Sequence, residues 1–262
     1  MEKCLAGSTT VYTVQSHNQV LEAWETCPGL NVFSLDYHTD TKEAFGSYAY
    51  WRTDSELKAG SCGNPDVRRR ELAQDKIQAY LDGKIDIRGI NDNLKHDEHM
   101  DFAVRSNIIS SAFVLSVNRN SSSSNPYVYI EGCDIEYSGQ PIMEYSMPCI
   151  PGCSRDSHDQ DCFRRYRDAC IDDSVLSMAV GMAESLNPGF FDAFILDIDC
   201  DYFNTEESLH PSSSEVFKSL IRKAALVTIA LEPECVKICR MEGCQLESRQ
   251  IADELKIIIG NA

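Results

Sequence analysis

The sequence lacks a long hydrophobic run and an excess of basic residues. No window approaches the roughly 18 consecutive apolar residues that a membrane span needs. The first 20 residues have no apolar core of the kind found in signal peptides. Lys and Arg number 24 against 41 Asp and Glu, which gives a formal net charge of −17. Because this charge disfavours unaided binding to phosphate backbones and anionic lipids, we expect no nucleic-acid partner and no membrane partner. Because a membrane span and a signal-peptide core are both lacking, we expect a cytoplasmic location.

Cysteine, in contrast, is abundant, with 12 residues scattered along the chain. A chain of 262 residues that is 43% hydrophobic and 25% charged can bury a core without a disulfide scaffold, so we expect reduced thiols. Two groups are close in sequence: Cys149, Cys153, Cys162 and Cys170 with His158, and Cys235, Cys239 and Cys244. Their spacings do not match common zinc motifs, so packing or loop thiols are favoured, with a zinc or redox role left open.

Apolar runs alternate with amphipathic stretches through most of the chain. Strands are predicted near residues 9–14, 30–38, 193–203 and 226–233, and helices near 18–25, 66–82, 174–186 and 247–259. A helix that runs into a strand is predicted over residues 101–117, and a further helix is predicted to begin at Ser212. Long apolar strands separated by helices predict a three-layer α-β-α fold with a mainly parallel sheet, formed by one domain over residues 1–262. Residues 118–170 are rich in Ser, Cys and Pro, contain the strand-like pieces YVYIE and PIMEYSM, and are expected to form an irregular excursion from this sheet.

Acidic side chains gather at the ends of two of the predicted strands. The first strand end carries Asp36, His38 and Asp40, and the second carries Asp197, Asp199 and Asp201. Residues two apart in an extended chain face the same side, so each set converges. Clustered carboxylates are unfavourable unless protons or cations neutralise them, which predicts a dinuclear site for hard cations such as Mn²⁺ or Mg²⁺. The alternative is that each set lies in solvent at the end of a loop.

The segments LDYHTD and LDIDCD resemble the D-x-H-x-D and D-x-D motifs of the ureohydrolases, the arginase and agmatinase superfamily. A further histidine in that family follows the first strand, a position that His17 occupies here. The resemblance implies an arginase–deacetylase type fold with two Mn²⁺ ions. It implies His17, Asp36, Asp40 and Asp197 on one ion and Asp36, His38, Asp197 and Asp199 on the other, bridged by Asp36 and Asp197. Asp201 would orient a ligand.

Departures from the arginase motifs distinguish this chain from the arginases that act on free arginine. The chain has VQSH where arginases carry a Gly-rich G-G-D-H segment, and it has KHDEHMD where they carry a catalytic His in a different motif. Together with DIDCDYF, these features are similar to the peptide arginases, which convert arginine residues of ribosomally made precursor peptides to ornithine. The resemblance spans roughly residues 10 to 235. It implies a manganese-dependent hydrolase of guanidinium C–N bonds whose partner is an arginine-containing precursor peptide.

The remaining roles concern substrate binding and proton transfer. Glu232 follows a strand and precedes Pro233, as does the guanidinium-binding Glu of arginases, which implies the same role. The ornithine amine must be protonated as it leaves, and His96 and His99 are the candidates, with His99 favoured and Glu98 assigned to substrate contact. Glu232 could instead face solvent, and the H-x-x-H segment could hold a single metal.

The sequence leaves three functions open. The first is peptidyl-arginine hydrolysis, to which the negative surface would attract a cationic substrate, although this charge could equally serve solubility. The second is a related hydrolase of another guanidino or amide substrate, such as agmatine or an acetylated amine. The third is a non-catalytic peptide-binding protein stabilised by metal.

Overall fold

A computed structural model describes residues 1–118, 125–132, 136–146, 164 and 166–262. Its eight strands form one sheet in the order β1-β2-β8-β7-β3-β4-β6-β5, in which β1 and β2 are antiparallel and every other pair is parallel. The strands are β1 Glu2–Ala6, β2 Thr9–Val14, β3 Leu30–Asp36, β4 Ile109–Ser116, β5 Val128–Ile130, β6 Ile142–Ser146, β7 Phe194–Asp199 and β8 Val227–Ala230. The mainly parallel sheet confirms the predicted α/β class.

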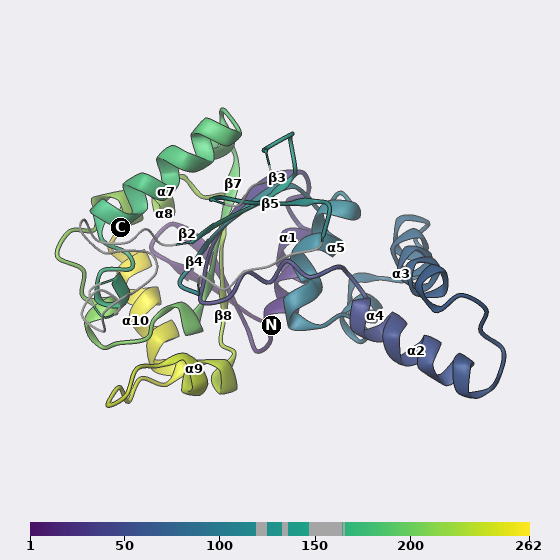
Figure 1. The fold of residues 1–262 in the computed structure, drawn as a ribbon. Helices are drawn as coiled ribbons and strands as arrows, with labels where there is room; N and C mark the ends of the chain where they lie inside the picture. Colours follow the sequence, from purple (N-terminus) through teal and green to yellow (C-terminus); the bar gives the residue numbers. More distant parts are fainter. Residues whose placement is uncertain (119–124, 133–135, 147–163, 165) are drawn as a thin grey trace.

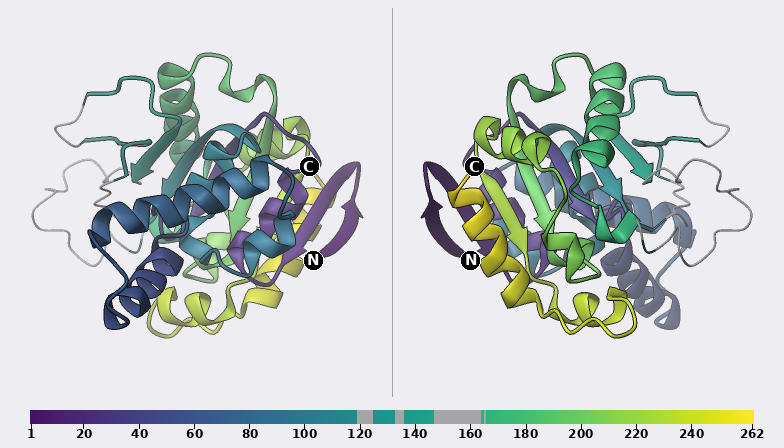
Figure 2. Two further views of the ribbon diagram at one scale, coloured as in Figure 1. Left: turned by 90° about the vertical axis from the view of Figure 1, so that its right-hand side faces the viewer. Right: turned by 90° about the vertical axis from the view of Figure 1, so that its left-hand side faces the viewer.

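Helices cover both faces of the sheet (Figure 1). One layer contains α7 Asp173–Leu186, α8 Glu215–Lys223 and α10 Ser248–Gly260, with α9 Pro233–Cys239 beside α10. The other contains α1 Leu21–Trp24, α3 Pro65–Leu81, α4 Ile87–Asn91 and α5 His99–Arg105, and α2 Gly46–Lys58 packs against α3. The views in Figure 2 show the same separation into two helical layers. Short 3-10 helices are η1 His17–Val20, η2 His96–Glu98, η3 Phe190–Asp192, η4 Cys200–Tyr202 and η5 Glu207–Leu209.

Alternation along the central strands divides the interior into two cores. In β7, Phe194, Leu196 and Ile198 lie in the core shared with α7, α8 and α10, whereas Ile195 lies in the core shared with α1 and α5. Asp197 and Asp199 have the same parity as Ile195, so they face the α1 and α5 layer. This alternation places the acidic groups of the central strands on one face of the sheet.

The excursion expected at residues 118–170 is in part a continuation of the sheet. β6 pairs in parallel with β4, and β5 pairs with β6 at the sheet edge. The apolar strand residues Val128, Ile130 and Ile142 are buried there, so these pieces belong to the core. Cys149, Cys153, His158 and Cys162 lie outside the described residues, and Cys170 is buried.

The alternation predicted through Asp201 places Cys200 on the face opposite the acidic residues, and Cys200 does lie in the core formed with α7, α8 and α10. Asp201, which was expected to continue the strand alternation, lies in η4 instead, because β7 ends at Asp199. Within the described residues, no helix is both long and apolar enough to cross a bilayer.

Candidate metal centre

The candidate site lies at the carboxyl ends of β3, β7 and β8, neighbours in the centre of the sheet. The parallel register pairs Ser34 with Asp197 and Leu35 with Ile198. Asp36 and Asp199 are therefore the next residues on their two strands and lie level with each other. Functional groups of parallel α/β sheets gather at this edge, where the strands end and loops begin.

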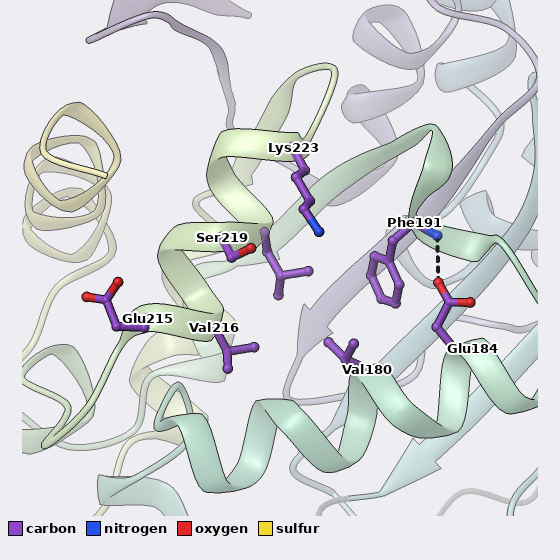
Figure 3. Close-up of a pocket in the computed structure, with 8 residues that line it drawn as sticks. Val180, Glu184, Phe191, Glu215, Val216, Ser219 and Lys223 are labelled. Atoms are coloured by element: carbon purple, nitrogen blue, oxygen red, sulfur yellow. Dashed lines mark hydrogen bonds between the residues drawn. The ribbon is translucent and has the colours of Figure 1, made fainter.

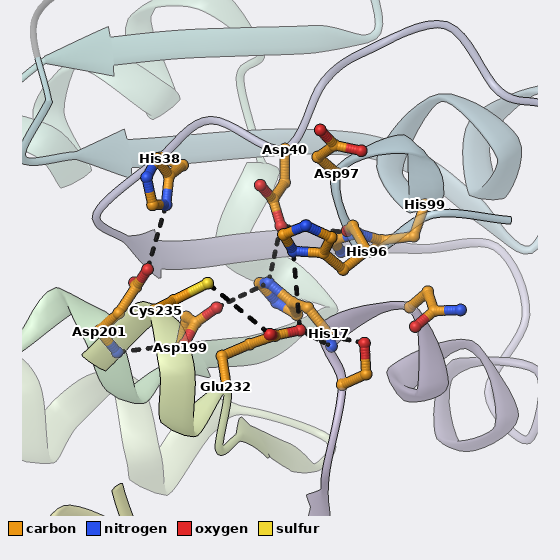
Figure 4. A network of polar contacts seen from close by, with 12 residues as sticks. His17, His38, Asp40, His96, Asp97, His99, Asp199, Asp201, Glu232 and Cys235 are labelled. Atoms are coloured by element: carbon orange, nitrogen blue, oxygen red, sulfur yellow. Dashed lines mark hydrogen bonds and ion pairs between the residues drawn. The ribbon is translucent and has the colours of Figure 1, made fainter. Parts of the chain in front are cut away.

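His17 stands at the centre of this site (Figure 4). It begins η1 directly after β2, and its ring is fully buried. Its Nδ1 lies 3.0 Å from Asp40 Oδ2, 3.1 Å from Asp199 Oδ2 and 3.6 Å from Asp36 Oδ2. We call His17, Asp36, Asp40 and Asp199 the inner group, whose four ligand atoms lie within 4.8 Å of one another.

The loop after β3 turns Asp40 into the inner group. Asp40 has a left-handed backbone with φ of 50°, a conformation that non-glycine residues seldom adopt outside tightly constrained sites. The loop is held by bonds from Ala44 N–H to the Asp101 carboxylate at 2.8 Å and from Lys42 N–H to the carbonyl of Asp97 at 3.0 Å. The position of the Asp40 carboxylate is thus fixed by the surrounding chain.

The inner group concentrates negative charge in the interior of the protein. Burial, followed by the neighbouring carboxylates of Asp40 and Asp201, raises the pKa of Asp36 well above its ordinary value. Burial and then Asp201 raise the pKa of Asp199 to about 8. Burial lowers the pKa of His17, but the carboxylates around it, Asp197 foremost, outweigh this effect and raise it well above 6.5. Without a metal ion, protons must offset the repulsion among these groups.

The inner group fits a divalent cation. One imidazole and three carboxylates form a donor set rich in hard oxygen ligands. Asp36 Oδ1 accepts the backbone N–H of His38 at 2.8 Å, and its Oδ2 has no hydrogen-bond partner among the described residues although it is buried. A buried carboxylate oxygen without a donor is unfavourable unless a cation or proton occupies the space before it.

Asp197 precedes Asp199 by two residues on β7, so it lies further from the end of the strand than the inner group. Its Oδ2 accepts from His17 Nε2 and from Ser34 Oγ, both at 2.8 Å, and its Oδ1 accepts from Thr228 Oγ1 at 2.5 Å. Burial raises the pKa of Asp197, but the charge and hydrogen bond of His17 outweigh burial, so that the pKa is lowered. The structure thus surrounds the expected bridging ligand with protein donors and brings Asp199 to the inner group in its place.

A second set of possible ligands lies beside the inner group. His38 Nδ1 and Cys239 Sγ are 3.1 and 3.8 Å from Asp201 Oδ2. We call His38, Asp201 and Cys239 the outer group, whose ligand atoms also lie within 4.8 Å of one another. The hydrogen bond to Asp201 raises the pKa of His38. His38 was expected to join Asp197 and Asp199, but its partner in the structure is Asp201.

Glu232 marks the rim of the site. Its Oε1 accepts the backbone N–H of His17 at 2.6 Å and Ser16 Oγ at 3.1 Å, so its carboxylate is tied to the chain that carries the inner imidazole. His96 Nδ1 lies 3.7 Å from Oε1, and Cys235 Sγ lies 3.8 Å from Oε2. We call His96, Glu232 and Cys235 the rim group. The φ of Glu232 is 36°, a second left-handed residue in the site.

The two histidines expected to protonate the ornithine amine, His96 and His99, lie in opposite environments. The side chain of His96 is 42% exposed at the rim. His99 is fully buried, with Nδ1 2.6 Å from the carbonyl of His96 and Nε2 without a partner among the described residues. Burial, and then the charge of His17, lower the pKa of His99 to about 3. His99 is therefore neutral at ordinary pH, and with His17 and Asp197 it forms another buried set of possible ligands.

Glu98, expected to contact substrate, is engaged with the backbone instead. Its Oε1 accepts the N–H of Ser47 at 2.8 Å and its Oε2 accepts the N–H of Lys95 at 3.1 Å, and the residue is buried. Both oxygens thus join the start of α2 to the start of η2. Glu98 therefore has a structural role, because it joins these two parts of the backbone.

Two described pockets lie elsewhere. One of about 350 Å³ lies between α7 and α8, and its lining includes the apolar side chains of Val180, Phe191 and Val216 (Figure 3). Another of about 630 Å³ lies beside α2 and α3 and includes Arg69, Arg70 and Arg105. Neither of these two pockets contains a residue of the inner, outer or rim groups.

Cys235 and Cys239 are the site residues whose positions the sequence did not indicate. They are four apart on α9, which packs against η4, so they share one helix face next to Glu232 and Asp201. The available signal was the direct succession of strand, Glu232, Pro233 and two thiols at helical spacing. No family model, curated protein or solved structure matches this chain.

Proposed function

We propose that this protein is a metal-dependent hydrolase that converts arginine residues within peptides to ornithine and releases urea. The observation that carries the proposal is the inner group of one imidazole and three carboxylates, buried at the sheet edge, with the Glu232 carboxylate hydrogen-bonded to the backbone of His17. The set is suited to a hard cation, and the rim carboxylate is suited to a guanidinium. The alternation of mainly parallel strands with two helical layers supports an arginase–deacetylase type fold.

Two divalent ions, Mn²⁺ as the resemblance implies, would be the cofactor of this proposal. The inner group would hold the first, and His38 and Asp201 would contribute to the second. Asp36 and Asp199 would serve both ions; Asp199 Oδ2 lies 3.1 Å from His17 Nδ1, and its Oδ1 accepts the N–H of Asp201 at 3.1 Å. When bound, divalent ions would lower the pKa of a water molecule, which would be the nucleophile that guanidinium hydrolysis requires.

The chain binds and orients the substrate through the rim group. Glu232 accepts paired hydrogen bonds from the planar guanidinium, which holds the central carbon toward the inner group. His96, partly exposed and next to Glu232, donates the proton to the departing ornithine amine. Neutral, buried His99 packs against His17, with ring centroids 4.3 Å apart, and supports its orientation.

A peptide substrate is favoured by the sequence motifs and by charge. The KHDEHMD and DIDCDYF segments resemble those of peptide arginases, and a protein of net charge −17 attracts an arginine-containing peptide. His96 and Glu232 both lie at the rim, where an extended chain can present a side chain without being enclosed.

The test is mass spectrometry and urea assay of the purified protein with Mn²⁺. Parallel substrates are an arginine-containing peptide, free arginine, agmatine and an acetylated amine. We expect urea from the peptide, a mass decrease equal to the difference between arginine and ornithine residues, and no turnover by Asp36→Ala. Turnover of another substrate alone would reassign the enzyme. Two bound metal equivalents without any turnover would support the non-catalytic alternative.

A further inference from the structure

The outer group contains a thiol that the proposed chemistry does not use. Cys239 is the last residue of α9 and is 6% exposed, and Asp201 is 1% exposed. His38 Nδ1 and Cys239 Sγ both point to the same oxygen, Asp201 Oδ2, at 3.1 and 3.8 Å. The other oxygen accepts the backbone N–H of Tyr37 at 3.1 Å, which fixes the carboxylate plane. Three different ligand types therefore meet at one point, where Asp201 and Cys239 are buried and the side chain of His38 is 41% exposed.

The position of α9 places the Cys239 thiol next to Asp201. Glu232 and Pro233 start α9 at the end of β8, and Val236 anchors the helix in the core. Cys235 and Cys239, four residues apart on the adjoining face of the helix, then lie next to the site. Cys235 contacts the Glu232 carboxylate and Cys239 contacts that of Asp201.

The two groups differ in the cations that they suit. The inner group offers one nitrogen and carboxylate oxygens, which favour hard ions such as Mn²⁺. The outer group offers nitrogen, oxygen and sulfur, and thiolate ligands favour Zn²⁺ and related ions of the borderline class. A packing thiol that merely donates its S–H to Asp201 would give the same apo distances, so an experiment must separate the two roles.

We infer that Cys239 is a metal ligand of the outer group, so that the two metal positions have unlike donor sets and the outer one prefers zinc-like cations to Mn²⁺. On binding, the thiol releases its proton to water and the sulfur donates an electron pair to the ion. This inference rests on the dinuclear centre of the proposed function. It does not depend on which substrate is hydrolysed.

Cobalt titration of the metal-free protein tests the ligand directly, because a thiolate bound to Co²⁺ gives a charge-transfer absorption in the near ultraviolet that oxygen and nitrogen ligands do not give. We expect two bound equivalents, one of which develops this band. Cys239→Ser should lose the band and keep the inner equivalent. Cys235→Ser, the matched control on the same helix face, should keep it. Two bound equivalents without the band, or a band unchanged in Cys239→Ser, would overturn the inference.

A second measurement needs no variant, which guards against a Cys239→Ser protein that does not fold. X-ray absorption of the wild-type protein loaded with Zn²⁺ should show a sulfur neighbour at about 2.3 Å, and a shell of nitrogen and oxygen alone would contradict the inference. Competition between Zn²⁺ and Mn²⁺ should show a zinc preference at one position that falls at least roughly tenfold in Cys239→Ser, since even residues that only orient ligands contribute that much to affinity.

The outcomes separate this inference from the proposed function. Failure to bind any metal would remove the dinuclear centre and the thiolate ligand together. Two bound ions with a sulfur ligand but no urea release would retain the ligand assignment and reject the hydrolase. Urea release with no sulfur signal would retain the hydrolase and leave Cys239 as a packing residue.

Discussion

A hydrogen bond from the backbone N–H of His17 to Glu232 joins the inner group to the rim group, yet the two groups are built in opposite ways. The inner side chains are buried, and their positions are fixed by strand register and by a constrained loop. The rim combines one fixed residue, Glu232, with the half-exposed ring of His96. Under the proposed function, the buried carboxylates of the inner group would bind the cation and the more exposed rim would bind the substrate. Variants in each group should therefore fail in different measurements.

The largest effect is expected from Asp36→Ala. The change removes a carboxylate next to His17 that has a buried oxygen without a protein donor. Metal content should fall by at least one equivalent and activity by more than roughly 100-fold, since residues that only orient ligands already contribute 10- to 100-fold. Metal analysis after gel filtration and the urea assay check both effects. Retention of two equivalents would remove Asp36 from the centre.

The next effect distinguishes the two histidines. His96→Ala should lower kcat by roughly 100-fold, the scale of a positioned general acid, and should flatten the pH profile while metal content stays unchanged. His99→Ala should instead lower stability and metal affinity, because His99 is buried against His17 and its low pKa keeps it neutral. Rate profiles against pH for both variants check this. A flattened profile in His99→Ala alone would return the proton-transfer role to His99.

Glu232→Gln tests the rim without disturbing the inner group. Glutamine keeps the size and can still accept the N–H of His17, but it removes the charge that meets the guanidinium. We expect kcat/KM for the arginine peptide to fall roughly 10- to 100-fold, the value of a charge-assisted hydrogen bond, with full metal content. Glu234→Gln is the matched control, because Glu234 is exposed on α9 and paired with Lys237. Equal effects of the two changes would remove Glu232 from the substrate site.

The fold could be predicted because the apolar pattern of each central strand is long and regular. Residues 30–36 and 193–199 alternate or run apolar between turn signals, and they form β3 and β7. The helix α2 was not expected, because Gly46–Lys58 has only Ala49 and Thr53 buried and thus almost no apolar stripe. β5 and β6 were recognised as strand-like, but their pairing with β4 depends on contacts distant in sequence.

The alternation of side chains along a strand predicts which face an acidic residue occupies, but not how far along the strand it lies. Asp197, Asp199 and Asp201 are spaced by two, so the sequence predicts a common face without indicating where the strand ends. The register with β3 and β8 sets Asp197 beside Ser34 and Thr228 inside the sheet, and the chain turns into η4 after Asp199. A shift of two residues along a strand is invisible to alternation, and only the neighbouring strands define it.

The Asp197→Asn variant tests whether Asp197 orients His17 or is itself a metal ligand. If Asp197 orients His17 through Nε2, the variant should bind both metal ions with affinity for the inner ion lowered roughly tenfold, the lower end of the range for such partners. If Asp197 is instead a bridging ligand, both ions should be lost. Calorimetric titration with Mn²⁺ distinguishes the two. Ser34→Ala, which removes another donor to the same carboxylate, is the control and should have a smaller effect.

The smallest effect is a pH dependence of stability that exists only without metal. Between pH 6.5 and 8, an unfolded chain has lost its carboxyl protons and is losing those of its histidines, whereas the metal-free folded protein keeps protons on His17 and Asp199, whose pKa values are raised, that of Asp199 to about 8. Groups with raised folded pKa values lose their stabilising contribution as pH rises through those values. The free energy of unfolding of the metal-free protein should therefore fall with rising pH.

Each retained proton gives a slope of about 1.4 kcal/mol per pH unit. Saturating Mn²⁺ displaces these protons from the inner group, so the slope should vanish in this window. Urea denaturation at pH 6.5 and pH 8, with and without Mn²⁺, measures both slopes. The rim group provides the contrast, because Glu232→Gln should leave both slopes unchanged whereas Asp199→Asn should reduce the metal-free slope by the contribution of one proton. An identical pH dependence with and without Mn²⁺ would show that the inner carboxylates do not exchange their protons for a cation.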